Sequence, residues 1–458
     1  MKKLNLLFVL ALLLAATSTK AQNWNQIIKA VASDRAADDY FGFSVAISGD
    51  YAIVGAFQED EDASGGATLS AAGSAYIFVR SGGVWALQQK IVASDRAADD
   101  NFGYSVAISG DYAIVGAPYE DEDASGGATA NSAGSAYIFN RSGSTWTQQQ
   151  KIVTSDRDAD DNFGISVAIS GTYAIVGARL EDENASGGAT ASAAGSAYIF
   201  NRSGSTWTQQ QKIVASDRVA DDFFGSSVAI SGDYAIVGAY LEDENASGGA
   251  TASDAGSAYI FNRSGSTWAQ QQKIVAADRA VGDNFGTSVA ISGDYAIVGA
   301  SGEDENASGG ATLGLAGSAY IFSRSGSTWA QQQKIVAADR AAGDYFGISV
   351  AINGNYAIVG AILEDEDASG GATFSDAGSA YIFNRTGSTW AQQQKIVAAD
   401  RTANDQFGIS VSISGDYAIA GAPYESEDAS GNNTLSLSGS AYIFYGEPNV
   451  WTGAASTT

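Results

Sequence analysis

Cysteine and histidine are both absent from the 458 residues of this sequence. Without cysteine there are no disulfides, so packing and hydrogen bonds alone must hold the fold together. Without histidine the protein lacks the commonest general base, the usual zinc ligand and the usual pH switch. Basic residues are scarce, since 24 Lys and Arg stand against 51 Asp and Glu and give a formal charge of −27. Such a charge repels nucleic acid and anionic membranes, so we expect no nucleic-acid partner.

Long apolar runs are also lacking, except at the N-terminus. Two lysines precede an apolar segment over residues 4–16, and Thr19 and Ala21 occupy the −3 and −1 positions of a cleavage site. This pattern predicts a secretory signal peptide over residues 1–21. The run is shorter than the roughly 20 residues that cross a bilayer. We therefore predict an exported protein without membrane insertion, either secreted, periplasmic or held at the cell surface.

The rest of the chain is a repeat with a period of 61 residues. The pair Phe-Gly occurs seven times at this spacing, at Phe41 and Gly42, Phe102 and Gly103, Phe163 and Gly164, Phe224 and Gly225, Phe285 and Gly286, Phe346 and Gly347, and Phe407 and Gly408. A further glycine, in "VGA" or "AGA", keeps the same period, at Gly55, Gly116, Gly177, Gly238, Gly299, Gly360 and Gly421. A fixed period of this length is typical of solenoids and propellers.

Each repeat contains four segments rich in β-branched and aromatic residues and bounded by Gly, Ser, Asp and Asn. In the first repeat these segments span residues 24–31, 41–48, 51–56 and 74–80. Short turns such as Ser-Gly-Asp join them as antiparallel hairpins. Four antiparallel strands in each of seven repeats predict an all-β, seven-bladed β-propeller over residues 22–446. A β-solenoid is the alternative, which the tight hairpins disfavour.

The composition of the segments suggests where each lies in a blade. Segment 41–48 alternates large and small side chains, with Phe41 and Phe43 on one face, and this suits an inner strand. Gly55 marks a close approach of two backbones. The segment that carries Trp and "QQK" is the most polar, so we expect it at an exposed edge, where its lysine would discourage strand addition.

The two ends of the chain suggest how the ring closes. Trp24 is followed by a credible strand, whereas the last repeat tryptophan, Trp451, is followed by "TGAASTT", which is not one. We therefore predict that the N-terminal strand completes the seventh blade beside residues 442–444, which removes an open sheet edge. Residues 447–458 are then a short polar tail.

The motifs "FGYSVAIS" and "YAIVGAP", at residues 102–109 and 112–118, resemble the FG-GAP repeat, and the resemblance extends over residues 24–444. That repeat builds the propeller at the head of integrin α subunits and occurs in many bacterial surface proteins. The calcium-binding members carry an acidic D-x-[DN]-x-D-G loop between the two motifs. Here only Ser-Gly-Asp stands in that place, and one carboxylate cannot supply six or more oxygens. The calcium site of the family is therefore not carried over.

The carboxylates are concentrated elsewhere, before each Phe-Gly and in loops such as "EDEDASGGAT" after each "GA". Alternate connections of antiparallel strands lie on opposite faces. The stretch with Asp34, Asp38 and Asp39 and the loop that starts at Glu59 should therefore share one face. We call it the top face. It is interpreted as a solvated rim that keeps the protein soluble and monomeric, as a docking face for a basic partner, or as a weak Ca²⁺ site of the extracellular type. The candidate calcium ligands are Asp38, Asp39, Asp60, Asp62, Asp121, Asp123, Asp182, Asp243, Asp304, Asp365 and Asp367.

Variation among the repeats gathers in the two residues after each "GA". Aromatic or charged side chains there could stack on a sugar ring or anchor a protein ligand. The candidates are Phe57, Tyr119, Arg179, Tyr240, Ile362 and Tyr424. They favour a non-catalytic adhesion or ligand-binding module that contacts a protein or glycan with its top face, although drift in permissive loops explains the same variation.

Two other functions stay open. A polysaccharide hydrolase or lyase needs only two carboxylates, but seven near-equivalent acidic loops offer no asymmetric pair with separated pKa values. A purely structural repeat scaffold needs no site at all. We therefore predict that the protein is not an enzyme.

Overall fold

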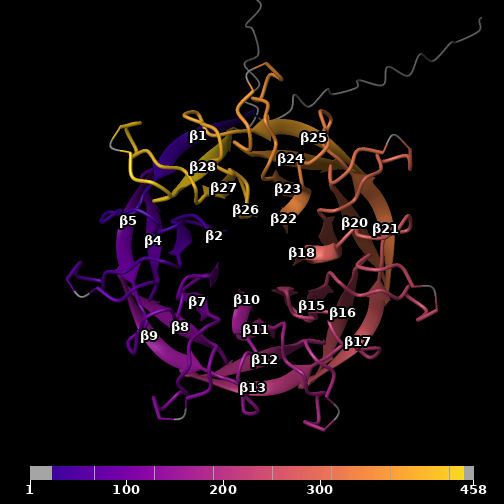
Figure 1. Cartoon of the computed structure of the whole chain (residues 1–458), viewed down its shortest axis with the longest axis horizontal. Helices are drawn as coiled ribbons and strands as arrows, with labels where there is room; N and C mark the ends of the chain where they lie inside the picture. The colour runs from indigo at the N-terminus through magenta and orange to yellow at the C-terminus, as the bar shows by residue number, and fades with distance from the viewer. Residues whose placement is uncertain are drawn as a thin grey trace, which may run out of the picture.

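The computed structural model describes residues 23–447, apart from residues 67, 128, 189, 250, 311, 372 and 433. The predicted signal peptide and Trp451 lie outside the described residues, as does the predicted polar tail beyond its first residue. The described residues form seven four-stranded antiparallel sheets, arranged as blades around a common axis (Figure 1). Within this part of the chain, no helix is long and apolar enough to cross a membrane.

Every blade has the same order of strands from the axis to the rim (Figure 1). The inner strands are β2 (Ser44–Ser48), β6 (Ser105–Ser109), β10 (Phe163–Ser170), β14 (Ser227–Ser231), β18 (Phe285–Ser292), β22 (Phe346–Asn353) and β26 (Val411–Ser414). The second strands are β3 (Tyr51–Ala56), β7 (Tyr112–Ala117), β11 (Tyr173–Ala178), β15 (Tyr234–Ala239), β19 (Tyr295–Ala300), β23 (Tyr356–Ala361) and β27 (Tyr417–Ala422). The third strands are β4 (Ser74–Ser81), β8 (Ser135–Ser142), β12 (Ser196–Ser203), β16 (Ser257–Ser264), β20 (Ser318–Ser325), β24 (Ser379–Thr386) and β28 (Ser440–Glu447). The outer strands are β5 (Val84–Ile91), β9 (Thr145–Ile152), β13 (Thr206–Ile213), β17 (Thr267–Ile274), β21 (Thr328–Ile335), β25 (Thr389–Ile396) and β1 (Asn23–Ala30).

Blades one to six each use four consecutive strands, and blade seven combines both ends of the chain. Strand β1 pairs antiparallel with β28, with Lys29 opposite Tyr442 and Gln26 opposite Phe444. The predicted seven-bladed propeller and its closure by the N-terminal strand are confirmed. Because β1 is the outer strand of blade seven, no sheet of the ring lacks its fourth strand.

The inner strand begins at the Phe-Gly pair in blades three, five and six, but in blade one it begins only at Ser44, after the pair. In blade one Gly42 has a φ of 97°, which bends the chain. The backbone of Phe41 forms a parallel bridge with Gly439 of the preceding blade, and its ring is fully buried. Phe43 lies beyond the bend and is only half-buried. The prediction that Phe41 and Phe43 share one face was wrong, because a glycine with positive φ interrupts the alternation.

The glycines of the repeat meet where neighbouring blades touch. A Cβ at Gly55 would overlap the carbonyl oxygen of Gly103 in the next blade. That oxygen also accepts a hydrogen bond of 2.7 Å from Ser44 Oγ. The close approach predicted at Gly55 is confirmed, and Gly421 meets Gly42 in the same way where the ring closes.

Glutamines of the outer strands also connect neighbouring blades. Gln89 Oε1 accepts a hydrogen bond of 2.9 Å from the Trp146 amide, and its Nε2 donates one of 2.7 Å to the Trp146 carbonyl. Gln394 makes the same pair of bonds with Trp24 on β1. The apolar core lies between the blades, in clusters that combine side chains of two neighbouring sheets.

Candidate functional site

Each blade contains a buried ion pair beneath its top face. In blade one the Lys90 ammonium on β5 bonds Glu59 Oε2 and lies 2.7 Å from Asp34 Oδ2. Glu59 is fully buried and accepts a further hydrogen bond from the Tyr76 hydroxyl. The equivalent lysine and glutamate pair in all seven blades.

The prediction of an exposed lysine at the polar edge strand was therefore wrong. The Lys90 side chain is 5% exposed, because its ammonium is needed to neutralise a glutamate that has no access to water. A buried carboxylate without a partner would be strongly destabilising. Some acidic residues of the top connections, such as Glu59, are thus buried in the core, whereas others, such as Asp38, are exposed.

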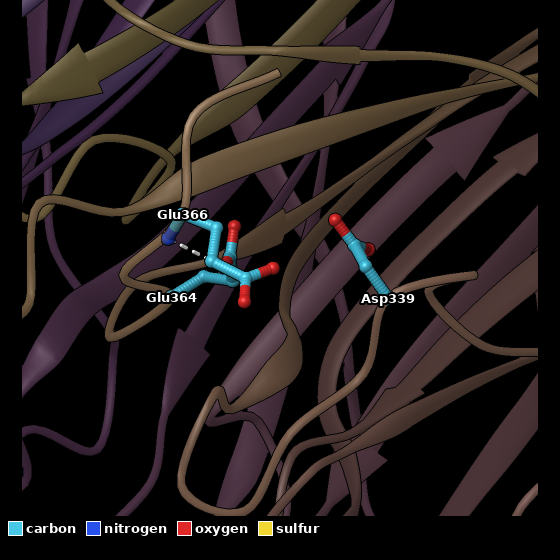
Figure 2. Close-up of side chains that lie close together, drawn as sticks. All are labelled: Asp339, Glu364 and Glu366. Carbon is cyan, nitrogen blue, oxygen red and sulfur yellow. Dashed lines mark hydrogen bonds between the residues drawn. The ribbon is translucent and has the colours of Figure 1, made fainter. Parts of the chain in front are cut away.

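Blade six holds the one cluster in the described part of the chain whose three acidic side chains could jointly coordinate a metal ion. Donor atoms of Asp339, Glu364 and Glu366 lie within 4.8 Å of one another. Figure 2 shows Glu364 and Glu366 side by side, with Asp339 facing them. The Lys395 ammonium lies 2.9 Å from Asp339 Oδ2 and bonds Glu364 Oε2. A lysine therefore already supplies the positive charge of this cluster.

The predicted calcium ligands in the acidic loops hold the loops themselves. Asp62 Oδ1 accepts hydrogen bonds from the Ser64 amide, the Ser64 hydroxyl and the Gly66 amide, at 2.8, 2.7 and 3.1 Å. In blade three Asn184 makes the equivalent three bonds with its amide oxygen. This position therefore requires an acceptor oxygen and not a charge.

The neighbouring aspartate of the loop has a similar role. Asp60 Oδ1 accepts a hydrogen bond of 2.8 Å from the Ala71 amide, where the backbone has a positive φ of 48°. The same bond recurs at Asp121, Asp182, Asp243, Asp304 and Asp365. Asp123 and Asp367 repeat the bonds of Asp62. Asp38 is exposed, and weak calcium binding by these residues stays a prediction.

A buried aspartate precedes each Phe-Gly. Asp39 accepts a hydrogen bond from the Ala36 amide and is 2% exposed. Burial raises the pKa of Asp39 to about 8, and Glu59 and Glu61 add to that rise by repulsion. Its equivalents in blades two to six have pKa values raised to about 7, and in blade seven to about 6. These carboxyls bind protons at a higher pH than ordinary aspartates do.

Four positions in each blade surround the axis on the top face, where the second strand ends and the inner strand begins. In blade one they are Tyr40, Phe43, Phe57 and Gln58. We call these positions and their equivalents in the other blades the hub. Unlike the fully buried residues beside them, most hub side chains are half-buried.

One side of the hub is an arc of aromatic rings that spans blades seven, one and two. Phe43 lies 4.6 Å from Phe57 and 5.0 Å from Tyr104 between ring centroids. Tyr40 lies 5.4 Å from both Phe57 and Tyr424. The complete arc consists of Tyr424, Tyr40, Phe57, Phe43, Tyr104 and Tyr119. The hub is therefore not sevenfold symmetric, although the strands beneath it are.

Comparison with known proteins identifies the repeat. The family model described as the FG-GAP repeat matches residues 24–78, 85–139, 146–200, 207–261, 268–322, 329–383 and 390–444. The chain belongs to the FG-GAP repeat family. No curated protein matches the sequence of this FG-GAP propeller. One similar solved structure is Sqt1 of Saccharomyces cerevisiae, with 9% identity and a TM-score of 0.46 over 94% of this chain and 100% of that one.

The six ligand-contacting residues predicted for this FG-GAP propeller all lie in the hub, and all are half-buried. Phe57, Tyr119 and Tyr424 belong to the aromatic arc. Tyr240 in blade four contacts the ring of Phe223 at 5.8 Å between centroids. Arg179 lies in blade three and Ile362 in blade six.

Sequence reasoning missed the other aromatic residues of the hub. Phe43 and Tyr104 directly follow Phe-Gly, where the pattern indicated an ordinary strand, and Tyr40 precedes it at the end of an acidic stretch. A signal was present, since the residues before and after each Phe-Gly vary between blades while the pair itself does not. The buried lysine had a signal too, because Lys and its partner Glu occur in every repeat while Asp62 alternates with Asn.

Proposed function

We propose that this protein is an exported, non-catalytic binding propeller, that it acts as a monomer, and that its hub contacts a glycan or protein ligand. The observation that carries the proposal is the contrast between the hub and the strands that support it. The second strand reads "YAIVGA" in six blades and "YAIAGA" in the seventh, whereas the next two residues take six different combinations. Neighbouring positions of one repeat have thus diverged at very different rates.

Backbone strain supports a selected function for the hub over drift. Tyr40 has a φ of 57°, in the left-handed region that bulky residues avoid. The equivalent Asn101 suits that conformation and donates hydrogen bonds of 3.1 Å to the carbonyls of Phe57 and Ala71. Phe223 and Tyr345 also replace asparagine at positive φ. Each aromatic residue there costs on the order of 1 kcal/mol or more, which drift would not favour three times.

The aromatic arc supplies the chemistry of a binding surface. Tyrosine and phenylalanine offer large contact areas at a small loss of side-chain entropy, and tyrosine adds a hydrogen-bonding group. The buried glutamates beneath the top face are paired with lysines, so they supply charge balance and not a free catalytic pair. Hydrolysis or elimination of polysaccharides and a purely structural role are the alternatives that an experiment must separate.

The experiment compares the mature protein with a hub variant on arrays of neutral and acidic oligosaccharides and of peptides. The hub variant combines Phe57→Ser and Tyr104→Ile, which are the residues that blades five and three carry at those positions. The control is Val84→Thr, since Val84 is 68% exposed on the outer strand and the other repeats from blade two to blade six have Thr there.

We expect the wild type and the Val84→Thr control to bind the same probe and the hub variant to lose it. Equal binding by all three proteins would show that the hub does not contact the ligand and would contradict the proposal. Turnover of a polysaccharide would establish the enzyme alternative, and no binding to any probe would favour the structural scaffold.

A further inference from the structure

Arg179 differs from every other cation in the described part of the chain. The other Lys and Arg residues there recur at three positions of the repeat, each with a structural partner. The lysines form the buried ion pairs, and the arginines before Phe-Gly donate to a loop carbonyl of the preceding blade, as Arg96 does to Asp60 O at 2.6 Å. The arginines of the third strands lie over a tyrosine of the preceding blade, as Arg141 does over Tyr51 at 4.6 Å. Arg179 follows none of these patterns, and it occurs once.

Arg179 lies in the hub directly after β11, between blades two and four. It is half-buried, and it makes no hydrogen bond or ion pair with any residue that the structure describes. The other described arginines bond a carbonyl or carboxylate oxygen through a terminal nitrogen, as Arg157 does with the Asp121 carbonyl. A guanidinium without such a partner is unexpected in a chain with 51 acidic residues. We therefore expect a ligand to supply the hydrogen-bond acceptor for the Arg179 guanidinium.

Arg179 acts electrostatically on two tyrosines of the hub. Burial raises the pKa of Tyr104, Tyr119 adds to the rise, and the charge of Arg179 opposes it. Burial also raises the pKa of Tyr240, again against the charge of Arg179. The guanidinium thus lies within electrostatic range of tyrosines from both neighbouring blades, one of which belongs to the aromatic arc.

We propose that the hub binds a glycan that carries an isolated carboxylate, such as a uronic acid residue, with Arg179 as its anchor. This inference rests on the proposed binding function of the hub and adds the class of its ligand. Arginine presents a planar fork that matches a carboxylate with two parallel hydrogen bonds. The flanking tyrosines offer aromatic faces and hydroxyls to the neighbouring sugar rings.

The charge of the whole protein selects among anionic ligands. With a formal charge of −27, the molecule repels polyanions and strongly acidic peptides at long range. A mostly neutral glycan with a single carboxylate avoids that repulsion and still satisfies Arg179. The further hub residues of blades four and five include the half-buried Ser226 and Thr287. Their hydroxyls donate to backbone carbonyls and keep lone pairs that can accept from sugar hydroxyls.

The test measures binding of the mature protein to two oligosaccharides that differ only in a terminal glucuronic acid or glucose, and to a glutamate-containing peptide. The first variant is Arg179→Ile, which uses the residue of blade six at the same position. The second adds Ile362→Arg, which restores the net charge at another place in the hub. Because Arg179 has no hydrogen bond to lose, both variants should melt at the temperature of the wild type.

We expect the wild type to prefer the glucuronic acid probe by about tenfold or more, as charge-assisted hydrogen bonds give. Arg179→Ile should remove the preference without removing the weaker binding of the glucose probe, and Ile362→Arg should not restore it. Added salt should reduce the preference of the wild type only.

A preference that persists in Arg179→Ile would overturn the inference, as would glutamate-peptide binding that equals that of the glucuronic acid probe. If the Phe57→Ser and Tyr104→Ile variant loses glucose-probe binding while Arg179→Ile changes nothing, the proposed function stands and this inference fails. If the wild type binds no probe of any array, both fail together.

Discussion

Replacing Lys395 with Met should destabilise the propeller through the glutamate that it leaves buried. The Lys395 side chain is 5% exposed and that of its partner Glu364 is 3% exposed, whereas Asp339 is 28% exposed and can be hydrated. Removing one member of a buried pair costs about 3–5 kcal/mol. Glu364 would retain hydrogen bonds from Ser379 Oγ at 2.8 Å and Tyr381 OH at 3.3 Å, so we expect the lower end of that range.

The corresponding shift in melting temperature follows from the size of the domain. Unfolding entropy of about 2.1 cal/mol/K per residue gives about 0.9 kcal/mol/K over the roughly 425 residues from Asn23 to Glu447. A loss of about 3 kcal/mol then lowers the melting temperature by about 3 °C. Calorimetry or thermal unfolding followed by circular dichroism measures this.

The control is the double variant Lys395→Met with Glu364→Gln, which removes both charges and leaves a neutral hydrogen-bonding group. It should recover more than half of the lost stability, since replacing a buried ion pair by neutral groups is often close to neutral. A single variant that melts within about 1 °C of the wild type would refute the reasoning that lysine neutralises this carboxylate.

Three further predictions concern the ring, its protons and calcium. A chain that begins at Arg35 lacks β1, so blade seven loses its outer strand and exposes an open sheet edge. It should melt at a much lower temperature than the mature protein. Equal melting temperatures would contradict closure by β1. Burial raises the pKa of Asp39 to about 8 and of Asp405 to about 6 from an ordinary 3.8, so the folded state binds these protons more tightly than the unfolded state. Their contribution to stability is fully present below about pH 4 and is lost as the pH rises to about 8. The melting temperature should therefore fall from about pH 5.5 to about pH 8.5, and it should fall less in Asp39→Asn. A melting temperature that rises over this range would contradict the raised pKa values. Weak calcium binding in the loops predicts that millimolar calcium raises the melting temperature relative to chelator and that Asp62→Asn reduces this rise; an unchanged melting temperature would reject a calcium site in the loop.

The architecture could be predicted because seven copies of the repeat carry the same pattern of strands and turns. One unbroken period and hairpin turns specify the blades, and the strand pattern after Trp24 indicates the segment that closes the ring. The bend at Gly42 could not be predicted, since a glycine in a strand pattern is compatible with either sign of φ. That bend places Phe43 in the hub and not in the core. The alternating pattern of the sequence did not indicate this, so the aromatic arc could not be predicted.

The place of the candidate site followed in part from the sequence. The variable positions after each "GA" lie in the hub, Arg179 among them. The buried ion pair was missed because "QQK" is typical of an exposed edge, and only the partner in another loop explains why the lysine is inside. Long-range pairs such as Lys90 with Glu59 become visible once the hairpins place both ends of a blade together.

The proposed trade between binding and stability at the hub is tested most directly by the variant Tyr40→Asn with Phe223→Asn. Both substitutions place asparagine at positive φ, as blades two, three and five already do. The account predicts that this variant is more stable than the wild type by about 1–3 kcal/mol in denaturant unfolding and binds the hub probe more weakly. A variant that is no more stable and binds with unchanged affinity would contradict the central claim that the aromatic hub is kept for its ligand.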